Sequence, residues 1–180
     1  ASAADHGAVM AQLAVVPDPA VRRTRILEQA GAALAPLGAG AALRQDPQLL
    51  EEVVFLCEHP TAFLGGFDAE FFALPPEVIV TALKEHQRYF AVAGADDRLE
   101  PAFVAVRDGG AEHLDTVRAG NERVLRARLA DALFYWRFDQ QRTPDDHAAA
   151  LASVTWLEGF GSVGDQVRRA GRLAEHLWTH

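Results

Sequence analysis

The 180-residue sequence has one cysteine, one methionine and one lysine. A single cysteine excludes an internal disulfide framework and a cysteine-based zinc site, and it is typical of a reducing compartment. Apolar neighbours surround this residue in VVFLCEHP, so we expect Cys57 to be a buried thiol and not a nucleophile. No apolar run approaches the roughly 18 residues of a membrane-spanning helix, and no secretory signal pattern is visible. We therefore expect a cytoplasmic protein without a membrane partner.

Recognisable catalytic patterns are also lacking. The sequence contains no GxxxxGK[ST] phosphate loop, and no Ser/His/Asp or Cys/His set can be argued from spacing. His176 and His180 have the i,i+4 spacing of a helical metal pair, but no third ligand accompanies them. We expect no catalytic residue, metal or bound cofactor in this chain.

The composition indicates a globular chain with an uneven charge. Hydrophobic residues make up 49%, charged residues 23%, and the net charge is −8. Acids exceed bases by six in residues 1–83 and by two in residues 143–180, whereas residues 84–142 are balanced. Such acidity disfavours indiscriminate nucleic-acid binding because the long-range field repels phosphate. A local patch that binds RNA is therefore expected only in the middle third.

Periodicity and capping residues predict an α+β fold that is predominantly helical. Two β-rich runs flank the turn-forming GADDRLEP and predict an antiparallel hairpin around 88–106. This small sheet is expected to pack on a long helix of about 112–138, and Gly65-Gly66 is expected to form a turn. Other helices are expected near 5–13, 19–37, 46–57, 68–73, 77–86, from 144, and 164–180. We divide the chain into helical residues 1–60, an α+β core at 61–142 and helical residues 143–180, which form one compact unit cut from a longer protein.

The long helix carries the clearest candidate for a binding surface. Its expected apolar face comprises Val117, Val124, Leu125, Leu129, Ala132, Leu133 and Trp136. Arg123, Arg126 and Arg137 project within about 60° of one another on a polar face, which suits a run of phosphates. The alternative is a solvated face with an i,i+4 pair between Glu122 and Arg126.

Another arginine on this helix, Arg128, is expected to have a structural role. Arg128 falls inside the expected apolar arc, where a buried guanidinium needs a partner. We expect a structural ion pair with Asp131 at i+3.

Three stretches carry a family resemblance: FLCEHPTAFLGGFDAEFFALP, LPPEVIVTALKEHQRYFAV and VRAGNERVLRARLADALFYWRFD. They resemble the β subunit of the bacterial heterotetrameric glycyl-tRNA synthetase, and weaker agreement extends over nearly the whole chain. The resemblance implies an internal segment of a much longer subunit. It implies that the α subunit holds the aminoacylation site, which uses ATP with Mg, and that the β subunit serves tRNA recognition and α2β2 assembly. The expected partners are therefore the α subunit, a second β subunit and tRNA(Gly). The family's HD-type domain is not expected here, since the sequence has no His-Asp dipeptide.

The helix-to-strand junction at 84–90 is a second place where RNA could bind. Lys84, His86 and Arg88 would line a groove, and Tyr89 would serve as a stacking platform for an unpaired base. The alternative is that Tyr89 and Phe90 straddle the strand, one buried and one exposed. The full set expected to bind tRNA is Lys84, His86, Gln87, Arg88, Tyr89, Arg123, Arg126 and Arg137.

Three functions remain open from the sequence. The first is a non-catalytic module that contacts tRNA(Gly) within the synthetase, with no aminoacylation activity of its own. The second is a structural module that packs against the α subunit or another β domain. The third is a hydrolase that edits mischarged tRNA, for which His86, His113 and Glu85 are the only nearby candidates.

Overall fold

A computed structural model describes residues 5–179, which form two compact units. The first unit ends at Leu133 and the second begins at Phe134. This boundary lies inside the long helix α5 (Leu114–Asp139), whereas the sequence analysis placed divisions after residues 60 and 142. Residues before and after 60 belong to one unit because α-helical residues between Ile26 and Cys57 share one hydrophobic core with strand residues such as Val92 and Val104.

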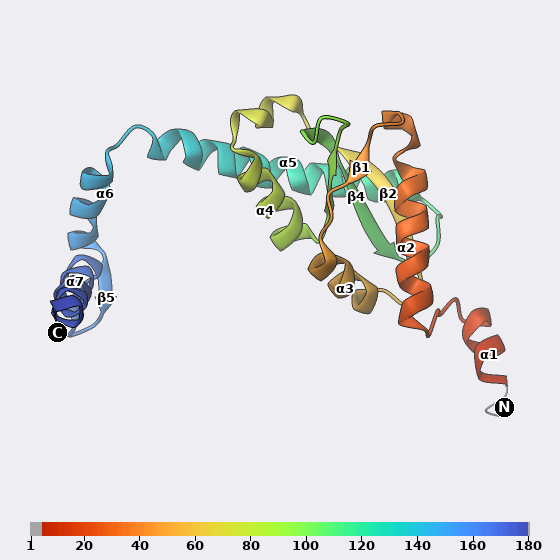
Figure 1. The fold of residues 1–180 in the computed structure, drawn as a ribbon, viewed down its shortest axis with the longest axis horizontal. Helices are drawn as coiled ribbons and strands as arrows, with labels where there is room; N and C mark the ends of the chain where they lie inside the picture. Colours follow the sequence, from red (N-terminus) through yellow and green to blue (C-terminus); the bar gives the residue numbers. More distant parts are fainter. Residues whose placement is uncertain (1–4, 180) are drawn as a thin grey trace. The chain divides into compact units, whose positions relative to one another are not determined.

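The first unit is built on a four-stranded antiparallel sheet (Figure 1). The strand order is β1-β3-β4-β2, with bounds β1 (Ala42–Leu43), β3 (Phe90–Ala93), β4 (Leu99–Asp108) and β2 (Pro60–Gly66). The expected hairpin is confirmed, since β3 pairs with β4 in a register that places Phe90 opposite Val104. β1 and β2 are additional strands that the sequence analysis did not identify.

Helices cover both faces of this sheet. On one face, α2 (Pro19–Ala33) and α3 (Pro47–Leu56) pack against strand residues such as Phe90, Val92 and Val104. On the other face, α4 (Pro76–Gln87), the 3-10 helix η3 (Ala69–Ala73) and α5 pack against residues such as Phe103. The α+β class and the packing of the sheet on the long helix are therefore confirmed.

Local signals set the helix starts as expected. The Asp18 carboxylate accepts a hydrogen bond from the Ala20 N–H at 2.8 Å, and Asp46 accepts one from the Leu49 N–H at 2.9 Å. A proline occupies the first helical position after each cap, where its missing N–H leaves no bond unmade. The short helices α1 (His6–Gln12) and η2 (Ala35–Leu37) flank α2.

The prediction of a turn at Gly65-Gly66 is wrong, because both residues end strand β2. A β-carbon at Gly65 would overlap the ring of Phe103, which is fully buried on the neighbouring strand. Gly66 donates its N–H to the Glu122 carboxylate of α5 at 2.9 Å. Gly65 thus allows a close approach of the Phe103 ring to the strand, and neither glycine reverses the chain.

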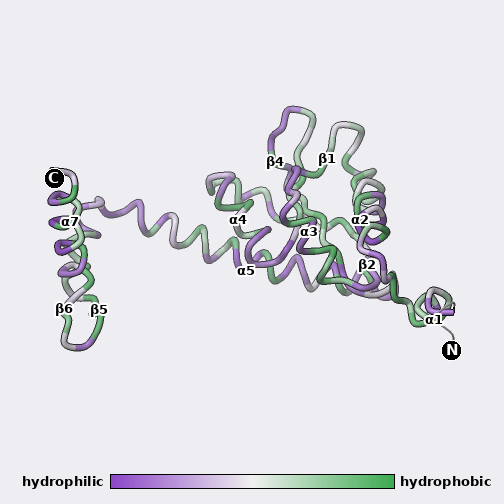
Figure 2. Tube along the Cα trace, turned by 60° about the horizontal axis from the view of Figure 1, so that its bottom comes forward, coloured by the Kyte–Doolittle hydropathy of each residue, from purple (hydrophilic) through white to green (hydrophobic). Residues whose placement is uncertain are grey.

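The second unit contains α6 (Pro144–Ala150), the 3-10 helix η4 (Leu151–Ser153), β5 (Thr155–Leu157), β6 (Gly161–Ser162) and α7 (Val163–Thr179). A capping box between Thr143 and Asp146 starts α6. Among the described residues of the elements α6 to α7, only Gly164 is buried. Figure 2 colours part of the β5–β6 hairpin as apolar. This unit therefore has little hydrophobic core of its own.

Two features are absent from residues 5–179. None of these helices combines the length and apolar content needed to cross a bilayer. Over the same residues, no group of three or more His, Cys, Asp or Glu side chains is arranged to hold a metal ion. His180, which the sequence analysis paired with His176, lies outside the described residues.

Candidate nucleic-acid interface and its internal ion pairs

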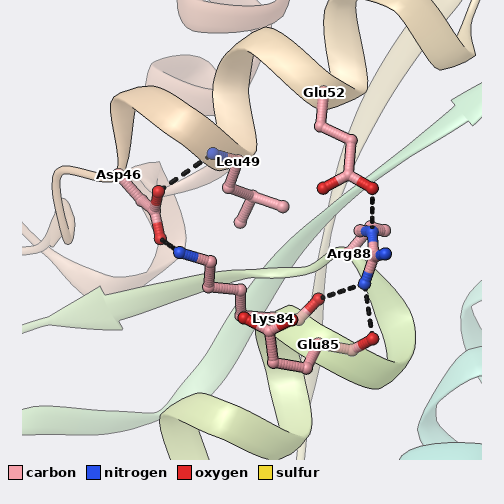
Figure 3. A network of polar contacts seen from close by, with 6 residues as sticks. All are labelled: Asp46, Leu49, Glu52, Lys84, Glu85 and Arg88. Carbon is pink, nitrogen blue, oxygen red and sulfur yellow. Dashed lines mark hydrogen bonds and ion pairs between the residues drawn. The ribbon is translucent and has the colours of Figure 1, made fainter.

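Two ion pairs join α3 to α4, and we call Asp46, Glu52, Lys84 and Arg88 the α3–α4 clamp. Lys84 Nζ lies 2.7 Å from Asp46 Oδ2, and Arg88 Nε lies 2.5 Å from Glu52 Oε1. Figure 3 shows both pairs reaching from α4 to α3. Two cations that the sequence analysis assigned to tRNA are thus engaged by carboxylates of the same chain.

Arg88 also ends α4 by its backbone and its side chain. Its φ of 58° is the left-handed conformation that stops a helix, and there glycine is the usual residue. Its guanidinium donates to the carbonyl of Lys84 at 3.1 Å and to that of Glu85. The Lys84 carbonyl also accepts the Arg88 backbone N–H at 3.1 Å, and the last carbonyls of a helix have no partner within the helix itself. Arg88 therefore has a structural role at this corner.

The ion pair between Asp46 and Lys84 shifts the pKa of both groups. Burial acts to raise the pKa of Asp46, but hydrogen bonds from Lys84 and the Leu49 N–H outweigh it and leave that pKa below its usual value. The hydrogen bond to Asp46 raises the pKa of Lys84. Each group therefore favours the charged state of the other, as expected for an ion pair formed at neutral pH.

Tyr89 does not provide a stacking platform. The residue is only 5% exposed, and its ring stacks on Phe103 with centroids 4.5 Å apart and planes 11° apart. Its hydroxyl donates to Asn121 Oδ1, and Asn121 in turn donates to the Val117 carbonyl at 2.8 Å. Burial raises the pKa of Tyr89 to about 12. Phe90 is buried as well, because helices cover both faces of the sheet, so the alternative of one buried and one exposed ring is also incorrect.

A surface depression of about 550 Å³ lies beside this junction. His86 is exposed at its rim and Gln87 is partly buried in it. Its lining also includes two carboxylates and two guanidiniums, those of Glu52, Glu85, Arg88 and Arg107. Because these four charges cancel, the depression offers hydrogen-bonding groups without a positive field for phosphate.

The arginines of α5 differ in their partners. Arg126 Nε lies 2.8 Å from Asp68 Oδ2, and the expected i,i+4 partner Glu122 is used by Gly66. Arg123 is exposed and has no carboxylate partner among the residues that the structure describes. Arg137 is exposed in the second unit, again without an ion pair in the described part of the chain.

The expected ion pair between Arg128 and Asp131 is absent from the described residues, and both side chains are exposed. The apolar face of α5 is narrower than its sequence pattern suggested, since Val124 on its edge is 44% exposed. Leu125, Leu129 and Leu133 alone are buried on this helix. Arg128 therefore lies in solvent and needs no internal partner.

The groups proposed for a hydrolase are not assembled. Glu85 and His86 line the depression described above, but His113 does not. His113 is exposed before α5 with a positive φ of 55°. Cys57 is buried as expected, and burial, reinforced by the charge of Asp108, raises the pKa of its thiol. A raised pKa disfavours the thiolate that a nucleophile requires.

Sequence reasoning missed three residues of the candidate site. Glu52, Arg107 and Asn121 reach the junction from α3, β4 and α5. Only Asn121 carried a signal, namely a polar residue in the middle of a helix, where a side-chain hydrogen bond to the backbone is expected. The pairing of Glu52 with Arg88 spans 36 positions in the sequence, so local spacing contains no trace of it.

Comparison with known proteins agrees with the resemblance. The model of one protein family, described as the glycyl-tRNA synthetase beta subunit, matches residues 1–180. Relatives named glycine–tRNA ligase beta subunit include that of Streptococcus thermophilus, 45% identical over 91% of this chain, and that of Desulforudis audaxviator, 43% identical over 98%. A third, from Syntrophomonas wolfei, is 44% identical over 94% of the chain.

All of these relatives are subunits of an aminoacyl-tRNA synthetase. The chain belongs to the family of the glycyl-tRNA synthetase β subunit. It is a segment of such a subunit, since the matched region is only 24–25% of the length of these relatives.

Proposed function

We propose that this chain is a non-catalytic segment of the glycine–tRNA ligase β subunit and that it serves mainly in assembly of the enzyme. It packs against the α subunit or against other β-subunit domains. The complete synthetase, which attaches glycine to its tRNA with ATP and Mg, is expected to be an α2β2 tetramer in the cytoplasm. The isolated chain is expected to show no aminoacylation.

The observation that carries this proposal is the exposed apolar surface of the second unit. Within described residues 134–179, twelve large hydrophobic side chains are exposed: Phe134, Tyr135, Trp136, Phe138, Val154, Trp156, Leu157, Phe160, Val167, Leu173, Leu177 and Trp178. Below about 70–80 residues a single hydrophobic core supplies little stability, and in the described elements α6 to α7 of this unit only Gly164 is buried. Exposed apolar side chains at this density mark a surface that another protein surface covers.

The assembly proposal is tested with Phe160→Asp in the full-length β subunit co-produced with the α subunit. Phe160 is 65% exposed in the β5–β6 hairpin. If a partner covers it, a buried carboxylate should weaken association at least about tenfold. Thr155→Asp is the matched control, because it adds the same charge to the same hairpin without removing an apolar group. Equal tetramer fractions for both variants, measured by light scattering after gel filtration, would exclude a role for this hairpin in assembly.

A second candidate function is direct contact with tRNA(Gly). It is favoured by Arg123 and Arg137, the two α5 residues of the expected tRNA-binding set that lack an ion pair within the described part of the chain. Guanidiniums without carboxylate partners are available to phosphate. His86 and Gln87 remain expected contacts to tRNA. Lys84, Arg88, Tyr89 and Arg126 are engaged mainly in bonds within the chain.

Arg123→Glu in the full-length subunit tests this second function. Loss of one phosphate contact should lower affinity for tRNA(Gly) and reduce the slope of log affinity against log salt by about one. Arg98→Glu is the control, since Arg98 lies in the β3–β4 loop and is 88% exposed. Identical salt slopes for the two variants would remove Arg123 from the RNA interface.

A further inference from the structure

Within the helix α7, only the residues of its first turn are buried or half-buried. At its start, Gly164 is buried against the backbone of Ala152, where an added β-carbon would lie 3.2 Å from the Ala152 nitrogen. The Val163 N–H donates to the Val154 carbonyl at 2.7 Å. From Val167 to Thr179 every residue is exposed. The described part of the chain thus buries none of the apolar side chains on this stretch of the helix.

The sequence of this exposed stretch divides cleanly into two faces. At 100° per residue, seven apolar or small residues fall within about 160°: Val167, Ala170, Gly171, Leu173, Ala174, Leu177 and Trp178. The remaining six residues, three of them arginines, occupy the opposite face, which spans about 120°. Such a division is typical of a helix with one side covered by apolar surface.

The apolar face has the shape of a groove. Ala170 and Ala174 lie along its centre, one helical turn apart. Leu173 and Leu177 form a ridge on one side, and Trp178, which is 90% exposed, stands on the other side. Small residues between two ridges let a second helix approach closely and insert its own side chains. The shape therefore fits an α-helix with large apolar residues at i and i+4 spacing.

The size of this face argues for an occupant on the same polypeptide. The exposed stretch is about 20 Å long and about 10 Å wide, or roughly 200 Å² in outline. Two separate chains need about 800 Å² from each partner for a stable interface. A covalently linked helix avoids most of the entropic cost of association, so a small apolar face suffices to bind it. The relatives supply ample chain for it, since this segment matches only about a quarter of their length.

We propose that the apolar face of α7 is covered by an amphipathic helix from another part of the same β-subunit polypeptide. This inference rests on the assembly function proposed above and assigns one surface and one partner to it. In the covered state, Ala170 and Ala174 lie at the helix–helix contact, and the arginine-bearing face remains in solvent.

Thiol labelling in the full-length β subunit tests the proposal. Ala174→Cys places a thiol at the centre of the groove, and Arg172→Cys places one on the opposite face as a matched control. The native Cys57 is buried, so it adds little background. Maleimide modification is followed peptide by peptide with mass spectrometry, in the 180-residue chain and in the full-length subunit without its α partner.

The expected result is that the thiol of the Ala174→Cys variant reacts at least about tenfold more slowly in the full-length subunit than in the short chain. The thiol of the Arg172→Cys variant should react at the same rate in both. Equal rates for the Ala174→Cys thiol in both proteins would overturn the proposal. Protection that needs added α subunit, or that grows with the concentration of the short chain, would assign the face to another chain. None of these labelling results changes the tetramer fraction expected for the Phe160→Asp variant. Failure of the α7 proposal can therefore be distinguished from failure of the assembly proposal.

Discussion

The Tyr89 hydroxyl donates a hydrogen bond to the Asn121 side chain and thereby joins the start of β3 to the long helix α5. The bond is made in the core under α4 and α5, beside the ring stack of Tyr89 on Phe103. A residue that the string HQRYF offers as an RNA contact is thus part of the internal structure. Its neighbours Lys84 and Arg88 are similarly engaged with α3.

Replacing Tyr89 with phenylalanine should destabilise the first unit by about 1–2 kcal/mol, because Asn121 Oδ1 loses its donor in a partly buried setting. The ring stack on Phe103 would be retained. Urea unfolding of the chain followed by circular dichroism measures this difference, and Tyr135→Phe at an exposed position serves as control. A Tyr89→Phe variant as stable as the parent would mean that the hydroxyl contributes nothing to the fold.

Alkaline pH should destabilise the protein through Tyr89. Its folded pKa of about 12 lies above the unfolded value of about 10, so folding favours the protonated phenol. The corresponding stability is fully present below the unfolded pKa and is lost as pH rises through the folded pKa. In a Tyr135→Phe background, where Tyr89 is the only tyrosine, absorbance at alkaline pH follows this single phenol. Ionisation well below pH 11 would contradict the buried position.

Gly65→Ala should cost about 1–3 kcal/mol, because the new methyl group overlaps the ring of Phe103, which is fully buried in the core. Gly66→Ala is a close control. Its β-carbon would meet only the Pro101 carbonyl oxygen, at an ordinary 3.5 Å. Thermal melts of the two variants compare them directly. Equal melting temperatures would show that the close approach of Phe103 to the strand is not a packing constraint.

The Arg88→Gly variant shows whether Arg88 of the α3–α4 clamp serves the fold or binds RNA. Glycine relieves the positive φ at this helix end, while the bonds to Glu52 and to two carbonyls are lost. We expect a folded protein, of slightly changed stability, whose affinity for tRNA(Gly) equals that of the parent. Filter binding at two salt concentrations measures it. A selective loss of tRNA affinity with intact folding would return Arg88 to the interface.

The sequence was informative where a structure depends on near neighbours. The caps at Asp18 and Asp46, the β3–β4 hairpin and the extent of α5 follow from local chemistry and periodicity. β2 was missed because its glycines resemble a turn, and only the distant Phe103 explains why they are there. The partners of Arg88 and Arg126 were missed because Glu52 and Asp68 lie 36 and 58 positions away.

The burial of side chains also depends on distant parts of the chain, so local sequence did not predict it. Tyr89 and Phe90 resemble a half-exposed strand in the sequence, and only the helices on both sides of the sheet bury both rings. Conversely, Val124 and Trp136 fit the helical period of α5 but remain exposed. Periodicity gives the face of a helix, and the width of the buried strip depends on what packs against it.

The central claim is that the second unit is an assembly surface, and amide hydrogen exchange tests it most directly. Exchange in residues 134–179 is compared between the 180-residue chain and the complete enzyme of α and β subunits. The account predicts strong protection of the β5–β6 hairpin and of α7 in the complete enzyme, with rapid exchange of both in the short chain. Equally rapid exchange in the two samples would mean that nothing covers this surface, and it would contradict the account.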